Sequence, residues 1–261
     1  MNREGEHSNC KPSVWRFMVR SKVTSALFLI SIFLLSIQSP LTLEDTKSSE
    51  VNGRSQTTWS GNVVLNNHYT VSVTDELVVS ACTNITMSNG VRIYVEGRIT
   101  VEGTTSCPVY FDHTGGGDHM GIQFNSSSNG RGSKIDNASI IHSTYGITIY
   151  GSNPILSNVT IWDPDDVGVD LFNSATPVIR NLTVEEAGQD WSFPAYWRYG
   201  IGLSIGAGSA PNIDGLTVNN AVTRGLNIWG NSGGLIRNVT LTNISGATLA
   251  QASGIWVQDS V

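Results

Sequence analysis

The sequence predicts an all-β protein built as a parallel β-helix, with three short strands in each coil. Three observations predict this fold. After about residue 60 the apolar stretches are short, and none of them has a helical period. Two strand-like elements alternate along that part of the chain. The first of these begins with glycine, and the second has Asn at its centre.

The first element reads glycine, apolar, any residue, apolar. Its successive glycines are 25, 22, 32, 25 and 29 residues apart, about 27 on average. A repeat of this length that holds only short strands is typical of a solenoid, in which each coil pairs with its neighbours. The six copies are GIQF (121–124), GITI (146–149), GVDL (168–171), GIGL (200–203), GLNI (225–228) and GIWV (254–257).

The second element has apolar residues two before its Asn and one and three after it. The alternation therefore shifts by one at the Asn, so we expect the chain to bend there and to point both flanking strands into one core. We expect each Asn to face inward and to form a ladder with the Asn of the next coil. The copies are CTNITM (82–87), IDNASI (135–140), LSNVTI (156–161), IRNLTV (179–184), IDGLTV (213–218) with Gly215 in place of Asn, and IRNVTL (236–241).

Two strands that meet at an Asn bend and one glycine-led strand make three strands per coil, with coils about 4.8 Å apart. This pattern resembles the right-handed parallel β-helix repeat proteins of the pectate-lyase-like superfamily, over roughly residues 58–261. The resemblance implies a single-stranded right-handed coil. It implies little about function, because that class contains lyases, hydrolases, epimerases, metal-delivery proteins and adhesive surface proteins.

Residues 1–43 predict an export segment. Basic residues precede the apolar run 23–37, as in a signal peptide. The run is shorter than the roughly 20 residues of a membrane-spanning helix. No clean cleavage site follows, so a cleaved signal and a signal-anchor that holds residues 23–43 in the membrane both stay open. Either one places the remaining chain outside the cell, secreted or at the cell surface.

The rest of the chain divides into two parts. Residues 44–58 are polar and without periodicity, which predicts a linker, and residues 59–261 form the predicted β-helix domain. The sequence stops in the middle of a coil without a closing cap, so we expect the domain to be truncated at its C-terminus.

The charge of the exported part restricts the partners. Residues 1–43 hold five of the 15 Lys and Arg and two of the 21 Asp and Glu, which leaves a net charge of −9. So acidic a domain is unsuited to nucleic acid or anionic lipid, and we expect membrane contact only through the N-terminal segment. A polysaccharide or cell-surface glycan is the expected partner.

The cysteine spacing predicts a disulfide. Cys82 holds the inward position of its element, and Cys107 follows 25 residues later, about one coil. Equivalent positions of stacked coils lie about 4.8 Å apart, within disulfide range. We therefore predict a bridge between adjacent coils. Two buried thiols are the alternative.

Seven Asn residues of the exported part have the N-x-S/T pattern for glycosylation. Five lie at the predicted bends, where we expect burial to keep sugars away: Asn84, Asn137, Asn158, Asn181 and Asn238. Asn125 and Asn243 lie outside the bends and are the predicted glycosylation sites.

The candidate ligand site combines two loops. The longest loop, 185–199, is rich in aromatic residues, and we expect it to stack beside loop 162–167. Flat aromatic faces with nearby carboxylates are typical of a glycan-binding platform, although packing of the loop onto the β-helix also explains the aromatic residues. The predicted ligand-binding residues are Trp162, Glu185, Glu186, Asp190, Trp191, Tyr196 and Trp197.

The alternative is a polysaccharide-active enzyme, a lyase or a glycoside hydrolase, with its site on the same loops. The resemblance to pectate lyases implies Ca²⁺ held by carboxylates and a basic residue, for which Asp163, Asp165, Asp166 and Arg198 are the candidates. No enzyme motif is matched at fixed spacing, so we assign no catalytic residue and no cofactor other than Ca²⁺. The main prediction is an exported surface domain with a structural, adhesive or glycan-binding role.

The stretch FDHTGGGDHMG (111–121) offers two Asp-His pairs, Asp112 with His113 and Asp118 with His119. Such side chains are able to hold a metal ion. The pairs have no fixed ligand spacing and lie in a loop, so the sequence favours a solvated turn and predicts no metal site.

Overall fold

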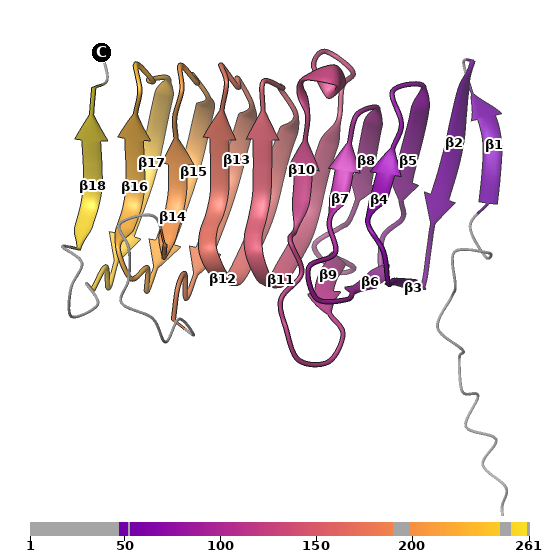
Figure 1. Ribbon diagram of the computed structural model, residues 1–261, viewed down its shortest axis with the longest axis horizontal. Helices are drawn as coiled ribbons and strands as arrows, with labels where there is room; N and C mark the ends of the chain where they lie inside the picture. Colours follow the sequence, from indigo (N-terminus) through magenta and orange to yellow (C-terminus); the bar gives the residue numbers. More distant parts are fainter. Residues whose placement is uncertain (1–46, 52, 190–198, 246–251, 260–261) are drawn as a thin grey trace, which may run out of the picture. The chain divides into compact units, whose positions relative to one another are not determined.

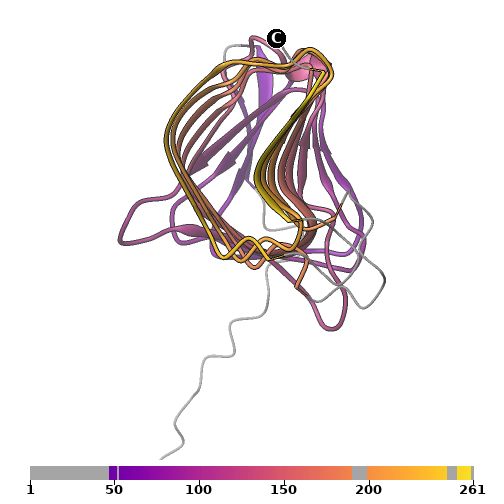
Figure 2. The same cartoon turned by 90° about the vertical axis from the view of Figure 1, so that its left-hand side faces the viewer.

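The computed structural model describes residues 47–51, 53–189, 199–245 and 252–259. It confirms the parallel β-helix, since strands of successive coils pair in parallel along the whole solenoid (Figure 1). Viewed along the solenoid, the coils superimpose around a common interior (Figure 2). Each coil contributes to three parallel sheets, as predicted.

The glycine-led sheet contains the first predicted element. Its apolar residues point into the core; Ile149 and Leu171, for example, are fully buried and adjacent in register. The sheet is built from β4 (Tyr69–Val71), β7 (Ile93–Val95), β10 (Ile122–Phe124), the last residues of β11 (Lys134–Tyr150) and β12 (Ile155–Phe172), β14 (Ile201–Ile205), β16 (Arg224–Trp229) and β18 (Ser253–Gln258).

The second and third sheets contain the two halves of the Asn element. Strands β2 (Arg54–Trp59), β5 (Asp75–Val79) and β8 (Arg98–Glu102) begin the second sheet. Strands β3 (Asn62–Leu65), β6 (Asn84–Met87) and β9 (Val109–His113) begin the third. In later coils one long strand crosses both sheets: β11, β12, β13 (Val178–Glu185), β15 (Asn212–Asn219) and β17 (Leu235–Thr242).

The predicted bend between these sheets is confirmed. Asn137, Asn158, Asn181 and Asn238 all have left-handed backbone, with φ between 46° and 54°. Asn adopts this conformation more readily than other residues with a Cβ, and Gly215, the replacement in the fifth copy, adopts it freely.

The predicted inward direction of these Asn side chains is wrong. Asn158, Asn181 and Asn238 are exposed, because a left-handed residue turns a convex corner and directs its side chain outward. The predicted ladder exists on the outside: Asn181 Nδ2 donates to Asn158 Oδ1 at 3.0 Å, and Asn158 Nδ2 donates to Asp136 Oδ1 at 3.2 Å. Burial therefore does not keep sugars away from these corners.

The earliest copy of the Asn element is displaced by two residues. Asn84 lies inside β6, opposite Tyr110, whereas Cys82 has the left-handed φ of 60° at the corner. Cys82 and Cys107 form a disulfide between adjacent coils, with their Cα atoms 4.7 Å apart. Cys82 is exposed at this corner rather than facing the core, so the partner was predicted correctly and the direction was not.

The fourth glycine-led copy is also displaced by two residues. Leu203 is the register partner of Val169, so the equivalent glycine is Gly202 and not Gly200. Close packing explains the glycine: a Cβ on Gly202 would lie 2.5 Å from Val218 Cγ1 and 2.7 Å from the carbonyl oxygen of Gly225. Glycine is needed here because the strand passes against core side chains and against the next coil.

The β-helix begins earlier than predicted. Strand β2 starts at Arg54, inside the predicted linker 44–58, and pairs in parallel with β5. Strand β1 (Lys47–Val51) pairs antiparallel with β2 and thereby covers its otherwise open edge. The sequence did not predict these two edge strands, because it is polar there and shows no strand periodicity. No helix among the described residues is long and apolar enough to cross a membrane, and the predicted export segment 1–43 lies outside those residues.

Candidate functional site

A column of polar residues runs across the outer surface of the glycine-led sheet. Its members are register partners in successive coils, because every second residue of a strand points away from the core. Asp170, Ser204 and Asn227 point outward and yet are only 7%, 4% and 6% exposed. The whole column is Gln123, Thr148, Asp170, Ser204 and Asn227.

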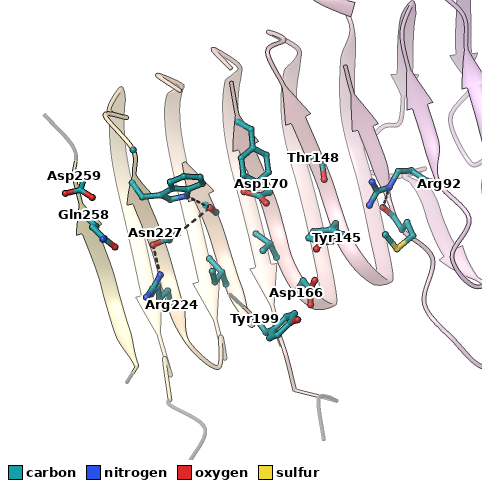
Figure 3. Close-up of a pocket in the computed structure, with 17 residues that line it drawn as sticks. Arg92, Tyr145, Thr148, Asp166, Asp170, Tyr199, Arg224, Asn227, Gln258 and Asp259 are labelled. Atoms are coloured by element: carbon teal, nitrogen blue, oxygen red, sulfur yellow. Dashed lines mark hydrogen bonds between the residues drawn. The ribbon is translucent and has the colours of Figure 1, made fainter. Parts of the chain in front are cut away.

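Four members of the column, Thr148, Asp170, Ser204 and Asn227, form the floor of a groove. In the later coils the glycine-led strands curve toward the interior of the solenoid, so the outer surface of this sheet is concave, as Figure 2 shows. The groove has a volume of about 890 Å³, which is within the range of small-molecule and oligomer sites. Its walls combine charged and aromatic side chains from several coils (Figure 3): Arg92, Tyr145, Asp166, Tyr199, Arg224 and Trp229.

Two arginines lie toward opposite ends of the groove (Figure 3). Arg92 Nε donates to the Met120 carbonyl at 2.9 Å, and its guanidinium lies 5.5 Å from the centre of the Tyr145 ring. Arg224 donates to Asn227 Oδ1 at 2.9 Å. Burial lowers the pKa of both arginines, but a guanidinium stays protonated in proteins. Both therefore supply fixed positive charge.

Asp166 is one of the carboxyl groups that line the groove, together with Asp170 and Asp259. Asp166 lines it and is 6% exposed, whereas its neighbour Asp165 is hydrogen-bonded to Asp118. Burial, Asp118 and the charges of Asp166 and Asp163 together raise the pKa of Asp165 to about 8. The pair formed by Asp118 and Asp165 therefore holds a proton at neutral pH.

Of the predicted site residues that the structure describes, only one lines the groove. Asp166 is the predicted residue that lines it. Trp162 and Glu185 are register partners, which confirms that the two loops begin side by side, but Trp162 packs against His142 instead. Asp163 and Glu186 have left-handed backbone at a corner of the coil. The remaining predicted residues, Asp190, Trp191, Tyr196, Trp197 and Arg198, lie outside the described residues.

The sequence contained a signal for the groove. The third position of the glycine-led element points outward, and Gln123, Thr148, Asp170 and Asn227 occupy it in four of the six copies. A polar column at that position on consecutive coils indicates a hydrogen-bonding floor. Arg92, Tyr145 and Trp229 follow no repeat, and only the fold brings them to this sheet.

The structure divides the histidine-rich stretch 111–121. His119 is fully buried; its Nδ1 accepts from the Gly121 amide at 3.0 Å, and its Nε2 donates to the Ile141 carbonyl at 3.1 Å. Burial lowers the pKa of His119 to about 4, so this ring is neutral and part of the core. Asp118 pairs with Asp165. The four predicted side chains therefore do not form one cluster.

Both predicted glycosylation sites use their amides in hydrogen bonds. Asn125 Nδ2 donates to Glu96, and Asn125 Oδ1 accepts from Gln123 at 2.7 Å. Asn243 is exposed, and its Nδ2 donates to Asn219 Oδ1 at 2.9 Å. Glycosylation of these two residues stays a prediction.

Comparison with known proteins gives one family. The family model described as "Right handed beta helix region" matches residues 50–245. The chain is also similar to a solved structure, the alginate lyase from Paenibacillus sp. str. FPU-7, with 15% sequence identity and a TM-score of 0.31. That match covers 62% of this chain and 70% of the lyase chain. A comparison with curated proteins gave no match.

Proposed function

The chain belongs to the right-handed β-helix family, and on this fold we propose that it is a glycan-binding protein that works outside the cell and holds a polysaccharide in the groove. The observation that carries the proposal is the buried polar column on an outward-facing sheet. Asp170, Ser204 and Asn227 line the groove and are only 4% to 7% exposed, although they lie on the outer surface of the sheet. Ser204 and Asn227 are hydrogen-bonded within the protein, and side chains of this kind are able to exchange further hydrogen bonds with the hydroxyls of a sugar.

The groove suits the chemistry of a neutral polysaccharide. Carboxylate oxygens of Asp166 and Asp170 accept hydrogen bonds from hydroxyls, while Asn227 both donates and accepts. The rings of Tyr145 and Tyr199 offer flat faces for the apolar faces of sugars. The coils repeat about every 4.8 Å, so the site is extended along the solenoid, as a linear chain requires. An acidic polysaccharide suits it less, because carboxylates lie on the floor and the exported part has a net charge of −9.

Two features support a location outside the cell. The basic and apolar sequence of residues 1–37 is typical of an export signal. The disulfide between Cys82 and Cys107 suits an oxidising compartment.

Binding to soluble polysaccharides tests the proposal. We expect retention of a neutral polysaccharide at neutral pH, and a Kd about tenfold higher for Asp170→Asn, since a hydrogen bond to a charged group contributes about 1.5 kcal/mol. Thr183→Ala changes an outward residue of the third sheet and is the matched control. Equal affinities of the wild type and Asp170→Asn would show that the polysaccharide does not bind in the groove.

Cleavage of the polysaccharide is the second candidate, and the titration of Asp165 favours it. A protonated carboxyl group beside a second carboxyl group is the pattern of a general acid and its partner. The pair Asp118 and Asp165 shares such a proton, and Asp166, which follows Asp165 in the sequence, lines the groove. Release of reducing ends or of unsaturated sugar ends by the wild type, lost in Asp165→Asn and Asp166→Asn, would support an enzyme. Binding without turnover supports the first candidate.

A further inference from the structure

We propose that Asp112, His113 and His142 form a binding site for a divalent transition-metal ion such as Zn²⁺. Asp112 and His113 end β9, and His142 lies in β11 of the next coil. One ligand atom from each of the three lies within 4.8 Å of the others. The sequence separates His142 from the other two residues, so the stretch 111–121 alone did not reveal the group.

The spacing of the ligand atoms fits a tetrahedral ion. Asp112 Oδ1 lies 3.0 Å from His113 Nδ1 and 3.0 Å from His142 Nδ1. A Zn²⁺ ion with bonds of about 2.0–2.1 Å has neighbouring ligand atoms roughly 3.3 Å apart. Two edges of one tetrahedral face are therefore nearly formed, and the fourth ligand position is left for water.

The fold holds the rings in place. His142 has the left-handed φ of 54° at a second corner of the coil, where Asp163, Glu186, Asn220 and Asn243 occupy the following coils with the same conformation. The His142 ring packs edge-on against His113, with centroids 4.5 Å apart, and against Trp162 on the other side, at 4.9 Å. This stack across three coils fixes the His142 imidazole beside Asp112.

The site is accessible, and its donors select the ion. The side chains of Asp112, His113 and His142 are 40%, 25% and 29% exposed, so ions and water reach them. Two imidazole nitrogens and one carboxylate oxygen suit Zn²⁺, Ni²⁺ or Cu²⁺, whereas Ca²⁺ and Mg²⁺ prefer oxygen ligands throughout.

Without metal, the two imidazoles are positioned to hydrogen-bond with Asp112 Oδ1. Metal binding needs both Nδ1 atoms free of hydrogen, and in a neutral imidazole that hydrogen moves to Nε2. Protons compete with the ion for these ligand atoms, so we expect the affinity for the metal to fall as pH falls.

The proposal is independent of the groove, because no residue is shared between the two sites. Calorimetric titration of the full chain with ZnCl₂, after removal of metal with a chelator and of any affinity tag, tests it. We expect one ion per chain at this site and a Kd about 100-fold higher for His142→Asn. Asn tolerates the left-handed backbone of residue 142, so this variant keeps the fold. Asp112→Asn should weaken binding in the same way.

His68→Asn is the matched control, because His68 is exposed and lies outside the cluster. A second readout uses Trp162. Cu²⁺ quenches indole fluorescence at short range, so Cu²⁺ bound at His142 should quench a component that is missing in Trp162→Phe. The proposal is overturned if the wild type binds no Zn²⁺, or if His142→Asn binds it as tightly as the wild type does with the far-UV circular dichroism unchanged.

Discussion

The corner Asn residues keep the coil turning through their backbone conformation. Asn181 has a φ of 52°, and its side chain is exposed and donates a hydrogen bond to Asn158 of the neighbouring coil. A residue with a Cβ other than Asn or Asp costs about 1–2 kcal/mol in this conformation.

Substitution of Asn181 separates the two contributions. Asn181→Ala loses both the backbone preference and the hydrogen bond, and we expect it to lower the free energy of unfolding by about 1–2 kcal/mol. Asn181→Gly loses only the exposed hydrogen bond and should cost less. Denaturant unfolding of the two variants measures the difference, and equal losses would show that the backbone conformation does not matter.

The carboxyl pair Asp118 and Asp165 makes stability depend on pH. The pKa of Asp165 is about 8 in the folded protein and near 3.8 when unfolded, so the folded chain holds a proton that the unfolded chain lacks between these values. Stability therefore falls as pH rises toward 8, and the full loss is present above it. Asp165→Asn should remove this fall.

Thermal unfolding between pH 6.5 and 8 is the suitable measurement for this pair. The buried His119 has its lowered pKa near 4, so its own effect is confined to the window below about 6.5, where stability is lost as pH falls. We expect the midpoint of the wild type to drop across the measured window and that of Asp165→Asn to stay level. A parallel drop in both proteins would contradict the shared proton.

The glycine-led strand is the element whose packing shapes the groove. Gly146, Gly168, Gly202 and Gly225 are stacked, and a Cβ on each of them would meet core side chains and a backbone oxygen of the next coil at 3.0 Å or less. Close approach of this strand to the core produces the inward curve of the sheet and withdraws the polar column from solvent.

Gly202→Ala tests this role of the element. Overpacking of this kind costs about 1–3 kcal/mol, and the strand has to move outward, so we expect lower stability together with weaker glycan binding. Gly116→Ala is the control, because a Cβ there meets nothing within 4 Å and its backbone is not left-handed. Unfolding curves of the two variants that coincide would refute the close packing.

The elements differ in how far the sequence could predict them. Where the apolar residues and the Asn both repeat, as in 156–161 and 179–184, the strands and the corner were predicted at the correct residues. In CTNITM and GIGL the prediction was wrong by two residues. Asn84 and Gly200 match the pattern, but the structurally equivalent residues are Cys82 and Gly202. Only the register with the neighbouring coil distinguishes the two.

For the whole molecule, the fold was predictable, whereas only the polar floor of the groove had a signal in the sequence. Each coil packs against its neighbours alone, so every copy of the repeat carries the information for the core. The groove depends instead on residues far apart in the sequence, such as Arg92 and Arg224, which the stacking of coils aligns on one sheet. Among the aromatic residues of loop 185–199, Tyr199 lines the groove, and the others lie outside the described residues.

The cluster of Asp112, His113 and His142 also combines residues that are far apart in the sequence. Asp112 and His113 are neighbours in sequence, but His142 joins them only because β9 and β11 pair in adjacent coils. Asp118 and His119 belong to the same stretch of sequence, for which a solvated turn was predicted, but Asp118 interacts with Asp165 and His119 is fully buried.

The most direct test of the central claim is hydroxyl-radical footprinting of the protein with and without a neutral polysaccharide. Tyr145 and Tyr199 line the groove, whereas Tyr110 is 39% exposed on the third sheet and serves as the internal control. We expect the polysaccharide to lower the oxidation of Tyr145 and Tyr199 and to leave the oxidation of Tyr110 unchanged. Protection of Tyr110 alone, or bound polysaccharide with no protection of the groove tyrosines, would contradict it.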